Sequence, residues 1–581
     1  MVLAGHLRAG CPDYIVLPLY PILVMSTADW IVLIVTLVFI ISYGVFKSRG
    51  QHGTDTYVLA DRKMPWYIVL LGVMATQASA ITFLSAPGQA YTDGMRFVQY
   101  YFGLPIAMIV ICVTFIPIFQ RLKVYTAYEF LENRFDRKTR LLTSILFLLS
   151  RGLSTGISIY APSIILSTIM DWNIYLTNVI TGGVLMIYTF SGGAKAVAHT
   201  QKLQFLIILS AMAIAGYLVV DNLPGGLGFT DALYVAGKSG KLNVITTEFD
   251  WNDRYNIWSG VIGGFFLALS YFGTDNSQVG RYLTAKDTRE SRLGLIFNGL
   301  VKVPMQFAIL LIGALLFAFY SFYKAPLNFN ERAYTLLQQH QPQQTAAIES
   351  AYNGLHSEYQ ELAFRLADQR EQSSEQELER FLSRQHEMGI LRDSVQRLIN
   401  TNKLVADTND TNYVFLYFVM NTLPKGLIGL LFAVIFLASW GSISAALNSL
   451  AASSLIDVHL LGKEEPDQRR QLWLARMHTL FWGVFSIAVA MFAAQMGSLI
   501  EAVNILGSLF YGTILGIFLV AFYLKRASGT AVFYAAIYTE VVVVIIYLMN
   551  VVSFLWLNAI GALMVVLIAW IQTHWNKGNA T

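Results

Sequence analysis

In the stretch MATQASAITF, residues 74–83, polar side chains interrupt an otherwise apolar run at Thr76, Gln77, Ser79 and Thr82. Polar side chains at membrane depth are tolerated only where they are buried in protein or line a cavity. Packing of small and hydroxyl residues between helices explains a single Ser or Thr, but this cluster favours a discontinuous helix. In secondary transporters the unwound carbonyls of such a helix hold a cation near the bilayer midplane.

The rest of the chain has the composition of a membrane protein. Its 581 residues are 55% hydrophobic and only 13% charged, about half the charged fraction of soluble domains. Apolar runs of about 20 residues recur, the length that crosses a bilayer as a helix. Two cysteines, Cys11 and Cys112, exclude a disulfide framework or a thiolate metal site. We therefore expect an all-α polytopic membrane protein.

Thirteen transmembrane helices are predicted, at about 28–46, 65–90, 98–119, 141–169, 174–191, 202–221, 257–280, 293–323, 425–458, 472–495, 498–523, 530–550 and 553–573. Alternate loops hold 23 of the 40 Lys and Arg residues, and basic loops stay in the cytoplasm. This predicts a multi-pass protein of the cell inner membrane with its N-terminus outside and its C-terminus in the cytoplasm.

The predicted spans divide the chain into five parts. They are an external N-terminal tail (1–27), a first membrane part (28–323), an external insertion (326–412), a second membrane part (425–573) and a cytoplasmic tail (574–581). The insertion is rich in Gln, Glu and Arg, and its apolar residues step at helical spacing. The sequence SEQE at 374–377 resembles a capping box. We expect a helical hairpin over the external face, acting either as a spacer or as a gating or partner-binding element.

Three further stretches accompany the polar cluster. They are YTFSGGAKAV (188–197), TDNSQVGRYLTAK (274–286) and LASWGSISAALNSLAASSLIDV (437–458). Together the four motifs resemble the sodium/solute symporter family, which includes sodium/glucose, sodium/monocarboxylate and bacterial sialic acid transporters. The resemblance covers roughly residues 28–550 without the insertion. It implies a LeuT-type core of two inverted five-helix repeats that works by alternating access.

The resemblance also implies a sodium site between the first and eighth core helices. Its matching positions are Ala75, Ala78, Ala438, Gly441 and Ser442. Carbonyl ligands need no particular side chain, and Ser442 keeps its hydroxyl. Gly441 departs from the family, whose members usually have a hydroxyl there, so water or a rotated Ser439 would have to fill the gap. We expect the sodium-binding site where two interrupted spans cross, one near Ala75 and the other near Ser442.

A second sodium site of some family members matches Gln201, Gly441, Ser444 and Ala445. The family's aspartate is replaced by Gln201, and only Ser444 keeps a hydroxyl. We therefore expect one sodium ion per cycle, with the second site lost at Gln201 and Ala445. Proton coupling is disfavoured because Gln201 cannot titrate.

The solute site implied by the resemblance lies beside the first ion. Its candidate residues are Gln77, Ser79, Thr82, Phe97, Tyr101, Asp275, Asn276, Lys302 and Asn504. Lys302 and Arg151 lie ten or more residues inside their helices, where an uncompensated charge costs at least about 2.5–3.5 kcal/mol. Arg151 either reaches the substrate or pairs with an acid such as Asp275, and we favour the pairing.

These features predict a sodium-coupled symporter that imports a small polar organic solute, with a sugar or sugar derivative favoured. The alternatives are uptake of a carboxylate such as sialic acid or a monocarboxylate, and a transport-inactive membrane sensor with the same fold. The nine histidines are scattered, and GxSxG, P-loop and HExxH motifs are missing from the sequence, so we do not expect an enzyme. The expected partners are sodium, the solute and the lipid bilayer, with no nucleic acid.

Overall fold

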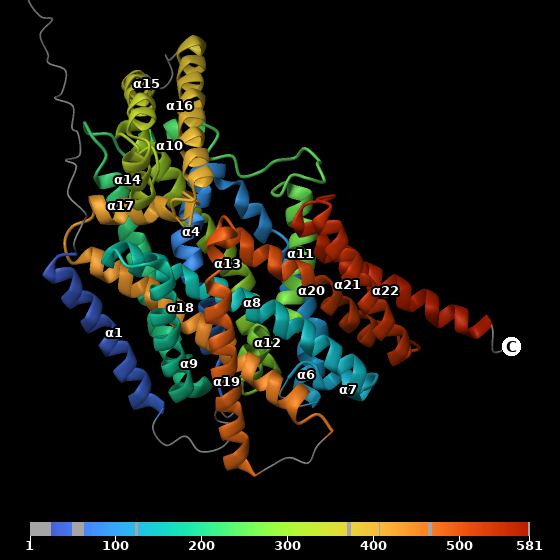
Figure 1. Ribbon diagram of the computed structural model, residues 1–581. Coiled ribbons are helices and arrows are strands. Elements are labelled where there is room, and N and C mark those ends of the chain that lie inside the picture. Colours follow the sequence, from blue (N-terminus) through green and yellow to red (C-terminus); the bar gives the residue numbers. More distant parts are fainter. Residues whose placement is uncertain are drawn as a thin grey trace, which may run out of the picture.

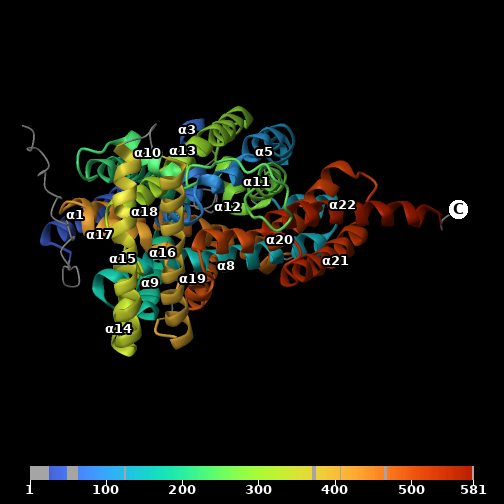
Figure 2. The same cartoon turned by 90° about the horizontal axis from the view of Figure 1, so that it is seen from above.

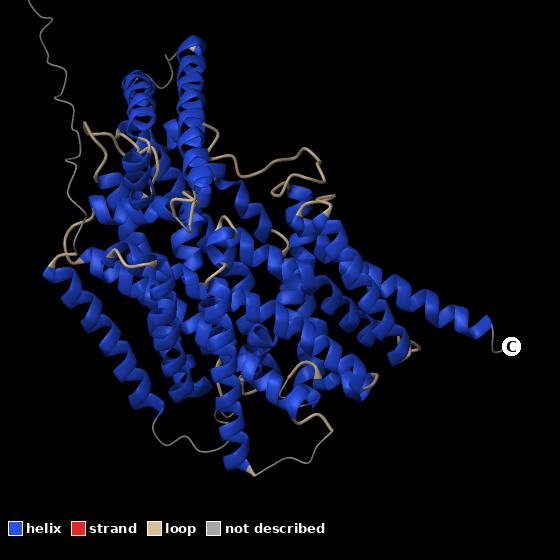
Figure 3. Ribbon diagram, viewed as in Figure 1, coloured by secondary structure: helices blue, strands red, loops and turns tan. Residues whose placement is uncertain are grey.

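The computed structural model describes residues 25–48, 63–122, 126–368, 374–405, 407–462 and 467–578. Most of the expected N-terminal tail and the loop residues Arg49, Arg62, Lys123 and Lys463 lie outside these ranges. So do the side chains of 191–199, which belong largely to the YTFSGGAKAV motif. Within the described ranges the chain is almost entirely helical (Figure 3).

The first part of the chain holds helices up to the insertion. They are α1 Thr27–Ser48, α3 Trp66–Gln77, α4 Ala80–Asp93, η2 Met95–Tyr101, α5 Leu104–Val110, η3 Ile111–Phe115, α6 Ile116–Leu122, α7 Glu129–Arg134, α8 Arg137–Met170, α9 Ile174–Asp221, α10 Phe229–Lys238, η4 Ser259–Gly263, α11 Gly264–Thr274, α12 Asn276–Leu283 and α13 Thr288–Phe322.

The insertion and the second part follow. Their helices are α14 Glu331–His340, α15 Pro342–Asp368, α16 Glu375–Asn402, η5 Thr411–Tyr413, α17 Val414–Thr422, α18 Leu427–Ser453, η6 Ser454–His459, α19 Gln468–Ala490, η7 Ala493–Gln495, α20 Leu499–Tyr523, α21 Gly529–Leu548 and α22 Phe554–Gly578. Figure 1 shows how these helices form one bundle, with α14–α16 on one face of it.

Every predicted span has an apolar helix as its counterpart in the described residues. Nine helices are long and apolar enough to cross a membrane, and the pair α3 and α4 makes one further, bent span. Shorter apolar helices cover the remaining predicted spans: Thr27–Ile40, Ile174–Ile187 and Ser259–Thr274.

The predicted loop between the spans 174–191 and 202–221 is wrong, because helical backbone continues through α9 from Ile174 to Asp221. That connecting stretch contains no proline, and its three alanines favour helix although Gly192 and Gly193 do not.

Two of the spans are broken helices. The axes of α3 and α4 differ by 60°, and the break falls at Ala78 and Ser79, whose backbone is not helical. The second break is at Asp275, between α11 and α12, where ψ is 116°. The Asp275 carboxylate accepts a hydrogen bond from the Ser277 N–H at 2.7 Å and so caps α12. The resemblance predicts that these two helices begin the two five-helix repeats.

The helix that carries Ser442 is not interrupted. We expected a break in this span from its many Ser and Ala residues, and that expectation is wrong: α18 is helical from Leu427 to Ser453 and continues as the π turn η6. The hydroxyls of Ser439, Ser442 and Ser449 bond to carbonyls of their own helix, as Ser439 Oγ does to the Ile435 carbonyl at 2.9 Å. Such bonds satisfy the hydroxyls without breaking the helix.

The insertion is a helical hairpin built from α15 and α16. Seen from above (Figure 2), the hairpin helices lie in front of the bundle, and we call the side that carries them the insertion face. The rings of Tyr359 and Phe381 stack between the two helices with centroids 4.7 Å apart. At the start of α16, Ser374 and Glu377 form both reciprocal hydrogen bonds of a capping box.

One arginine of the hairpin holds the outer end of the broken helix α4. Arg392 on α16 donates a hydrogen bond to the Tyr91 hydroxyl at 3.1 Å and another to Asp410 at 2.5 Å. Its guanidinium carbon lies 4.6 Å from the centre of the Phe329 ring. Burial raises the pKa of Asp410, and the Arg392 charge opposes that shift. Arg392 therefore joins the insertion to α4.

Replacing Arg392 with Ala is expected to lower the free energy of unfolding by about 3 kcal/mol, because it leaves a largely buried carboxylate without its cation. Thermal unfolding of the purified protein in detergent measures the change. Arg397→Ala is the matched control, since Arg397 is exposed on the same helix and bonds to the Asp393 carbonyl of its own helix. Equal melting of the two variants would contradict the importance of the Arg392 contacts.

Candidate functional site

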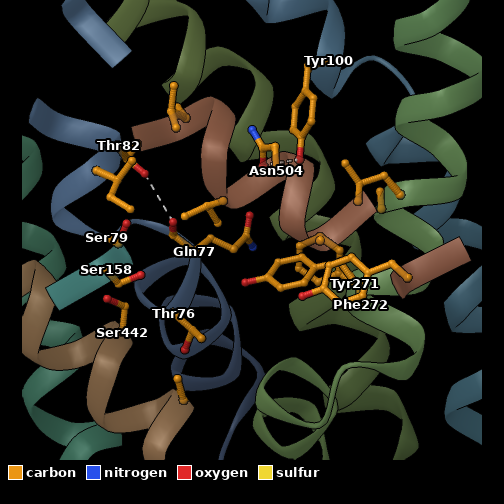
Figure 4. A pocket seen from close by; sticks show the side chains of 18 of the residues that line it. Thr76, Gln77, Ser79, Thr82, Tyr100, Ser158, Tyr271, Phe272, Ser442 and Asn504 are labelled. Atoms are coloured by element: carbon orange, nitrogen blue, oxygen red, sulfur yellow. Dashed lines mark hydrogen bonds between the residues drawn. The ribbon is translucent and has the colours of Figure 1, made fainter. Parts of the chain in front are cut away.

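A cavity of about 140 Å³ lies beside the break between α3 and α4. Its walls come from α8, α11, α13, α18 and α20 as well as from the broken helix. The predicted site residues that line it are Gln77, Ser79, Thr82, Tyr101, Arg151, Lys302, Ser442 and Asn504. Figure 4 shows several of these side chains around the cavity.

The break frees two backbone carbonyls. In an unbroken helix the N–H groups of Ser79 and Thr82 would bond to the carbonyls of Ala75 and Ala78. Here Ser79 N–H donates to the Gln77 carbonyl at 3.0 Å, and Thr82 N–H donates to the Ser79 carbonyl at 3.0 Å. Ala75 and Ala78 are buried, so their carbonyls have lost their helical donors in a place where water is scarce. A buried, freed carbonyl is a suitable ligand for a cation.

Across the cavity, α18 offers the Ser442 hydroxyl. Its hydrogen bonds run to the carbonyls of Ala438 and Ser439, each at 3.1 Å. The hydroxyl donates its one proton to this pair, which leaves its oxygen lone pairs available. Thr76, Ser79 and Ser442 line the same cavity (Figure 4). The broken helix and the unbroken one thus present oxygen atoms to one space.

Gln201 of α9 bridges these two helices. Its Nε2 donates to the Gly441 carbonyl at 3.1 Å and lies 3.5 Å from the Thr76 hydroxyl. A Cβ at Gly441 would lie 2.9 Å from Gln204 Oε1 and 3.4 Å from Gln201 Cγ, so a side chain there would require the Gln204 amide to move. The two glutamines therefore occupy the space into which a hydroxyl at residue 441 would project. Residue 441 therefore offers no hydroxyl to the cavity.

Three predicted solute residues do not line the cavity. Phe97 lies behind the aromatic wall, with its ring parallel to that of Tyr100 and 5.5 Å from it. Asn276 is buried and donates to the Ser453 hydroxyl at 3.2 Å, which ties α12 to α18. Asp275 is buried too and caps α12. These side chains support the site from outside the cavity.

Asp275 is the charge partner of Arg151, which does line the cavity. Arg151 Nη1 lies 4.0 Å from Asp275 Oδ2, and the exposed fractions of the two side chains are 10% and 0%. The Tyr511 hydroxyl donates to the same carboxylate oxygen at 2.7 Å. The pairing that the sequence favoured for Arg151 is therefore present.

Lys302 has no such partner. It projects from α13 into the cavity wall with 2% of its surface exposed. Its Nζ lies 5.4 Å from the centre of the Tyr101 ring, and no carboxylate of the described residues lies within 4 Å of it. The Lys302 amine faces the cavity and the face of an aromatic ring.

The sequence reasoning missed part of the lining. Tyr100, Tyr271, Phe272 and Tyr511 contribute aromatic surface, and Thr155 and Ser158 of α8 contribute hydroxyl positions. Aromatic residues count as ordinary spanning residues in a hydropathy pattern, so no polar signal marks them. Tyr271 and Phe272 do precede the TDNSQVGRYLTAK motif by less than one helical turn, which is the one signal that pointed to this wall.

Hydrogen bonds join α4 to α20 between the cavity and the insertion face. The hydroxyls of Ser85 and Ser498 lie 3.3 Å apart, and Ser498 donates to Gln89 Oε1 at 2.8 Å. Gln89 Nε2 lies 3.3 Å from Glu501 Oε1. These contacts hold the outer half of the broken helix against α20.

Comparison with known proteins identifies the family. The model of the sodium:solute symporter family matches residues 57–348 and 393–539. The rabbit (Oryctolagus cuniculus) sodium-dependent multivitamin transporter is 27% identical over 87% of this chain and 67% of its own. The sodium/sialic acid symporter of Aliivibrio fischeri is 24% identical over 95% of this chain and 94% of its own. The sodium-coupled monocarboxylate transporter 1 of Xenopus laevis is 27% identical over 85% of this chain and 68% of its own.

A solved structure shares the fold. A sodium-coupled sialic acid symporter in a substrate-bound outward-open state aligns with a TM-score of 0.73 and 22% identity, covering 95% of this chain and 98% of that one. At that identity the likeness shows the fold alone. The family model, by contrast, covers well over half of the sequence on both sides of the insertion. This multi-pass membrane protein therefore belongs to the sodium:solute symporter family.

Proposed function

We propose that this protein imports a small polar organic solute together with sodium, by alternating access across the cell inner membrane. The observation that carries the proposal is the pair of freed, buried carbonyls at Ala75 and Ala78. They do not line the cavity themselves but are neighbours in sequence of residues that do, and Ser442 lines the same cavity from α18. A hard cation binds oxygen ligands, and this arrangement brings them together from two helices.

The proposed sodium ligands are the carbonyls of Ala75, Ala78 and Ala438 and the hydroxyl of Ser442. Gly441 was a further candidate, but its position is filled by the amides of Gln201 and Gln204. Water would complete the coordination. Ser439 is the weaker candidate for that role, because it does not line the cavity.

We infer a single sodium ion per cycle. At the position of the second site, Gln201 presents its amide nitrogen, which donates to the Gly441 carbonyl. An amide N–H₂ is a donor and cannot bind a cation. The Gln201 oxygen has no partner among the described residues, but it carries no charge to replace that of the family's aspartate. Ala445 has no side-chain oxygen, so Ser444 is the remaining hydroxyl of that set.

The solute would occupy the cavity beside the ion. Gln77 is held for this role, since its Nε2 donates to Asn298 Oδ1 at 2.9 Å and its oxygen is left for another partner. Ser79, Thr82 and Asn504 add hydrogen-bonding groups, and Tyr101 adds an aromatic face. These groups suit a sugar or sugar derivative. The relatives named above for sialic acid and monocarboxylates support the alternative of an organic acid.

Coupling follows from the shared position of the ion and the solute. Sodium would draw the ends of α3 and α4 toward the unbroken α18, and this would order Gln77, Ser79 and Thr82 for the solute. The coupling free energy is reciprocal and typically about 1–3 kcal/mol. Opening toward the insertion face would then separate α4 from α20 at Ser85 and Gln89.

The positive-inside pattern supports an orientation with the insertion outside, the N-terminus outside and the C-terminus in the cytoplasm. In that orientation the hairpin covers the external face, where it contacts α4 through Arg392. A role in gating is therefore favoured over that of a spacer or a docking element.

Counterflow in proteoliposomes tests the function. We expect accumulation of a labelled sugar, sialic acid or short carboxylate when the vesicles are in NaCl, and none in KCl, with a hyperbolic dependence on sodium. A thermal-shift screen of the same compounds in the two salts selects the substrate. Sodium-independent counterflow would contradict sodium coupling. Sodium-dependent binding without counterflow would favour the transport-inactive sensor.

A further inference from the structure

The ionisable groups at the cavity do not balance. Arg151 and Lys302 both line it. Among the described residues, Asp275 is the one carboxylate within 4 Å of either, and it faces Arg151. With Lys302 protonated, one positive charge in the cavity wall is left without a counter-charge. Such a charge at membrane depth requires a partner.

Two fully buried side-chain atoms of the cavity wall have no partner among the described residues, and both are hydrogen-bond donors. Asn504 accepts a bond from the Tyr100 hydroxyl at 3.0 Å through its oxygen, and its buried Nδ2 has no partner among the described residues. Buried Arg151 Nε is unpartnered in the same sense. Together with the Lys302 ammonium, these atoms supply proton donors, which is what an anion needs.

We propose that the transported solute is a monoanion, and that Lys302 binds its negative group while Asn504 donates a second hydrogen bond. This inference rests on the proposed function and narrows its substrate class from polar solutes to anions. The favoured anion is a carboxylate, because Gln77 and the hydroxyls beside it remain to bind the rest of an organic molecule. It replaces the neutral sugar that the sequence favoured.

The proposal also gives an electrostatic reason for coupling. Sodium bound near Ser442 and the Lys302 ammonium border the same cavity, so without an anion they repel each other. An anion between them attracts both charges. Each ligand then improves the binding of the other, and sodium alone binds weakly. Lys302 is thus a specificity-determining residue that also sets the sodium affinity.

The first experiment needs no knowledge of the solute. Sodium affinity is measured from thermal unfolding of the purified full-length protein as NaCl replaces KCl. We expect Lys302→Gln to raise the apparent sodium affinity about tenfold, because it removes a repulsive charge. Lys302→Arg keeps the charge and should leave the affinity near that of the wild type. Lys324→Gln removes an exposed lysine at the end of α13 and serves as the control.

The second experiment compares each acid with a neutral analogue in NaCl. The pairs are lactate with lactamide, and N-acetylneuraminate with its methyl ester, and sodium iodide tests an inorganic anion. We expect at least one acid to stabilise the wild type and its neutral analogue not to do so. Lys302→Gln should weaken that binding at least about tenfold, and Lys302→Arg should retain it. Stabilisation by iodide alone would assign the site to an inorganic monoanion.

The outcomes separate this inference from the proposed function. Stabilisation by the neutral analogues as strong as by the acids, stabilisation by no anion, or an unchanged sodium affinity in Lys302→Gln would each overturn the anion site. None of these results affects sodium coupling. If the wild type responds identically to NaCl and KCl, the proposed function itself fails.

Discussion

Replacing Asp275 with Asn is expected to destabilise the protein by about 3–5 kcal/mol and to abolish transport. The substitution removes the counter-charge of Arg151 and leaves a buried guanidinium unpaired, which is among the most costly changes a folded chain can undergo. It preserves the shape of the residue and an oxygen that can still cap α12. Thermal unfolding and counterflow measure the two effects.

The matched control is Asp287→Asn. Asp287 caps α13 in the same manner, accepting from the Glu290 N–H at 2.9 Å, but it is exposed and neutralises no buried cation. We expect that variant to behave like the wild type. Adding Arg151→Met to Asp275→Asn should recover stability, because removal of both charges avoids the unpaired one. A double variant as unstable as Asp275→Asn would show that the loss comes from the other contacts of Asp275, with Ser277 and Tyr511, and not from the unpaired Arg151.

Ser442→Ala is expected to weaken the apparent sodium affinity about 10- to 100-fold, the effect of losing one oxygen contact to a charged group. The fold should survive, because alanine is favourable inside a helix and α18 is unbroken. Sodium titrations of uptake and of thermal stability measure the change. Ser442→Thr restores the hydroxyl and should restore most of the affinity.

A second serine of α18 controls for the loss of a hydroxyl. Ser449 is buried two turns away and bonds to the Ala445 carbonyl at 3.0 Å, much as Ser442 bonds to that of Ala438, but it does not line the cavity. Ser449→Ala should leave sodium dependence unchanged. If Ser442→Ala and Ser449→Ala have the same sodium dependence as the wild type, the hydroxyl of Ser442 is not a ligand.

The sequence predicted the spans and the first broken helix, because polar residues in an apolar run have few structural explanations. It failed for α18, where the same signal had another cause. There the hydroxyls of Ser439, Ser442 and Ser449 bond back to carbonyls one turn earlier, so the helix remains intact. The pattern of polar residues alone cannot distinguish a hydroxyl that replaces a backbone bond from one that adds to it.

The break at Asp275 shows the converse. The residues before it are aromatic and apolar, so hydropathy predicts one continuous span, and Asp275 was taken for a solute ligand. Its side chain is instead used by its own backbone as a cap and by Arg151 and Tyr511. Side-chain direction near a break depends on the local dihedral angles, which is why Asp275, Asn276 and Phe97 were placed on the correct elements but not correctly beside the cavity.

The hydrogen bond between Arg392 and Tyr91 joins the hairpin to α4, the segment whose tilt would open or close the proposed binding site. Any tilt of α4 must therefore move the hairpin with it or break the Arg392–Tyr91 hydrogen bond. A small rotation of α4 should then produce a larger displacement at the tip of the hairpin. A donor–acceptor dye pair, with one dye on the hairpin tip and the other on a neighbouring helix of the bundle, would report this displacement during single turnovers. Neither dye would be attached in the cavity.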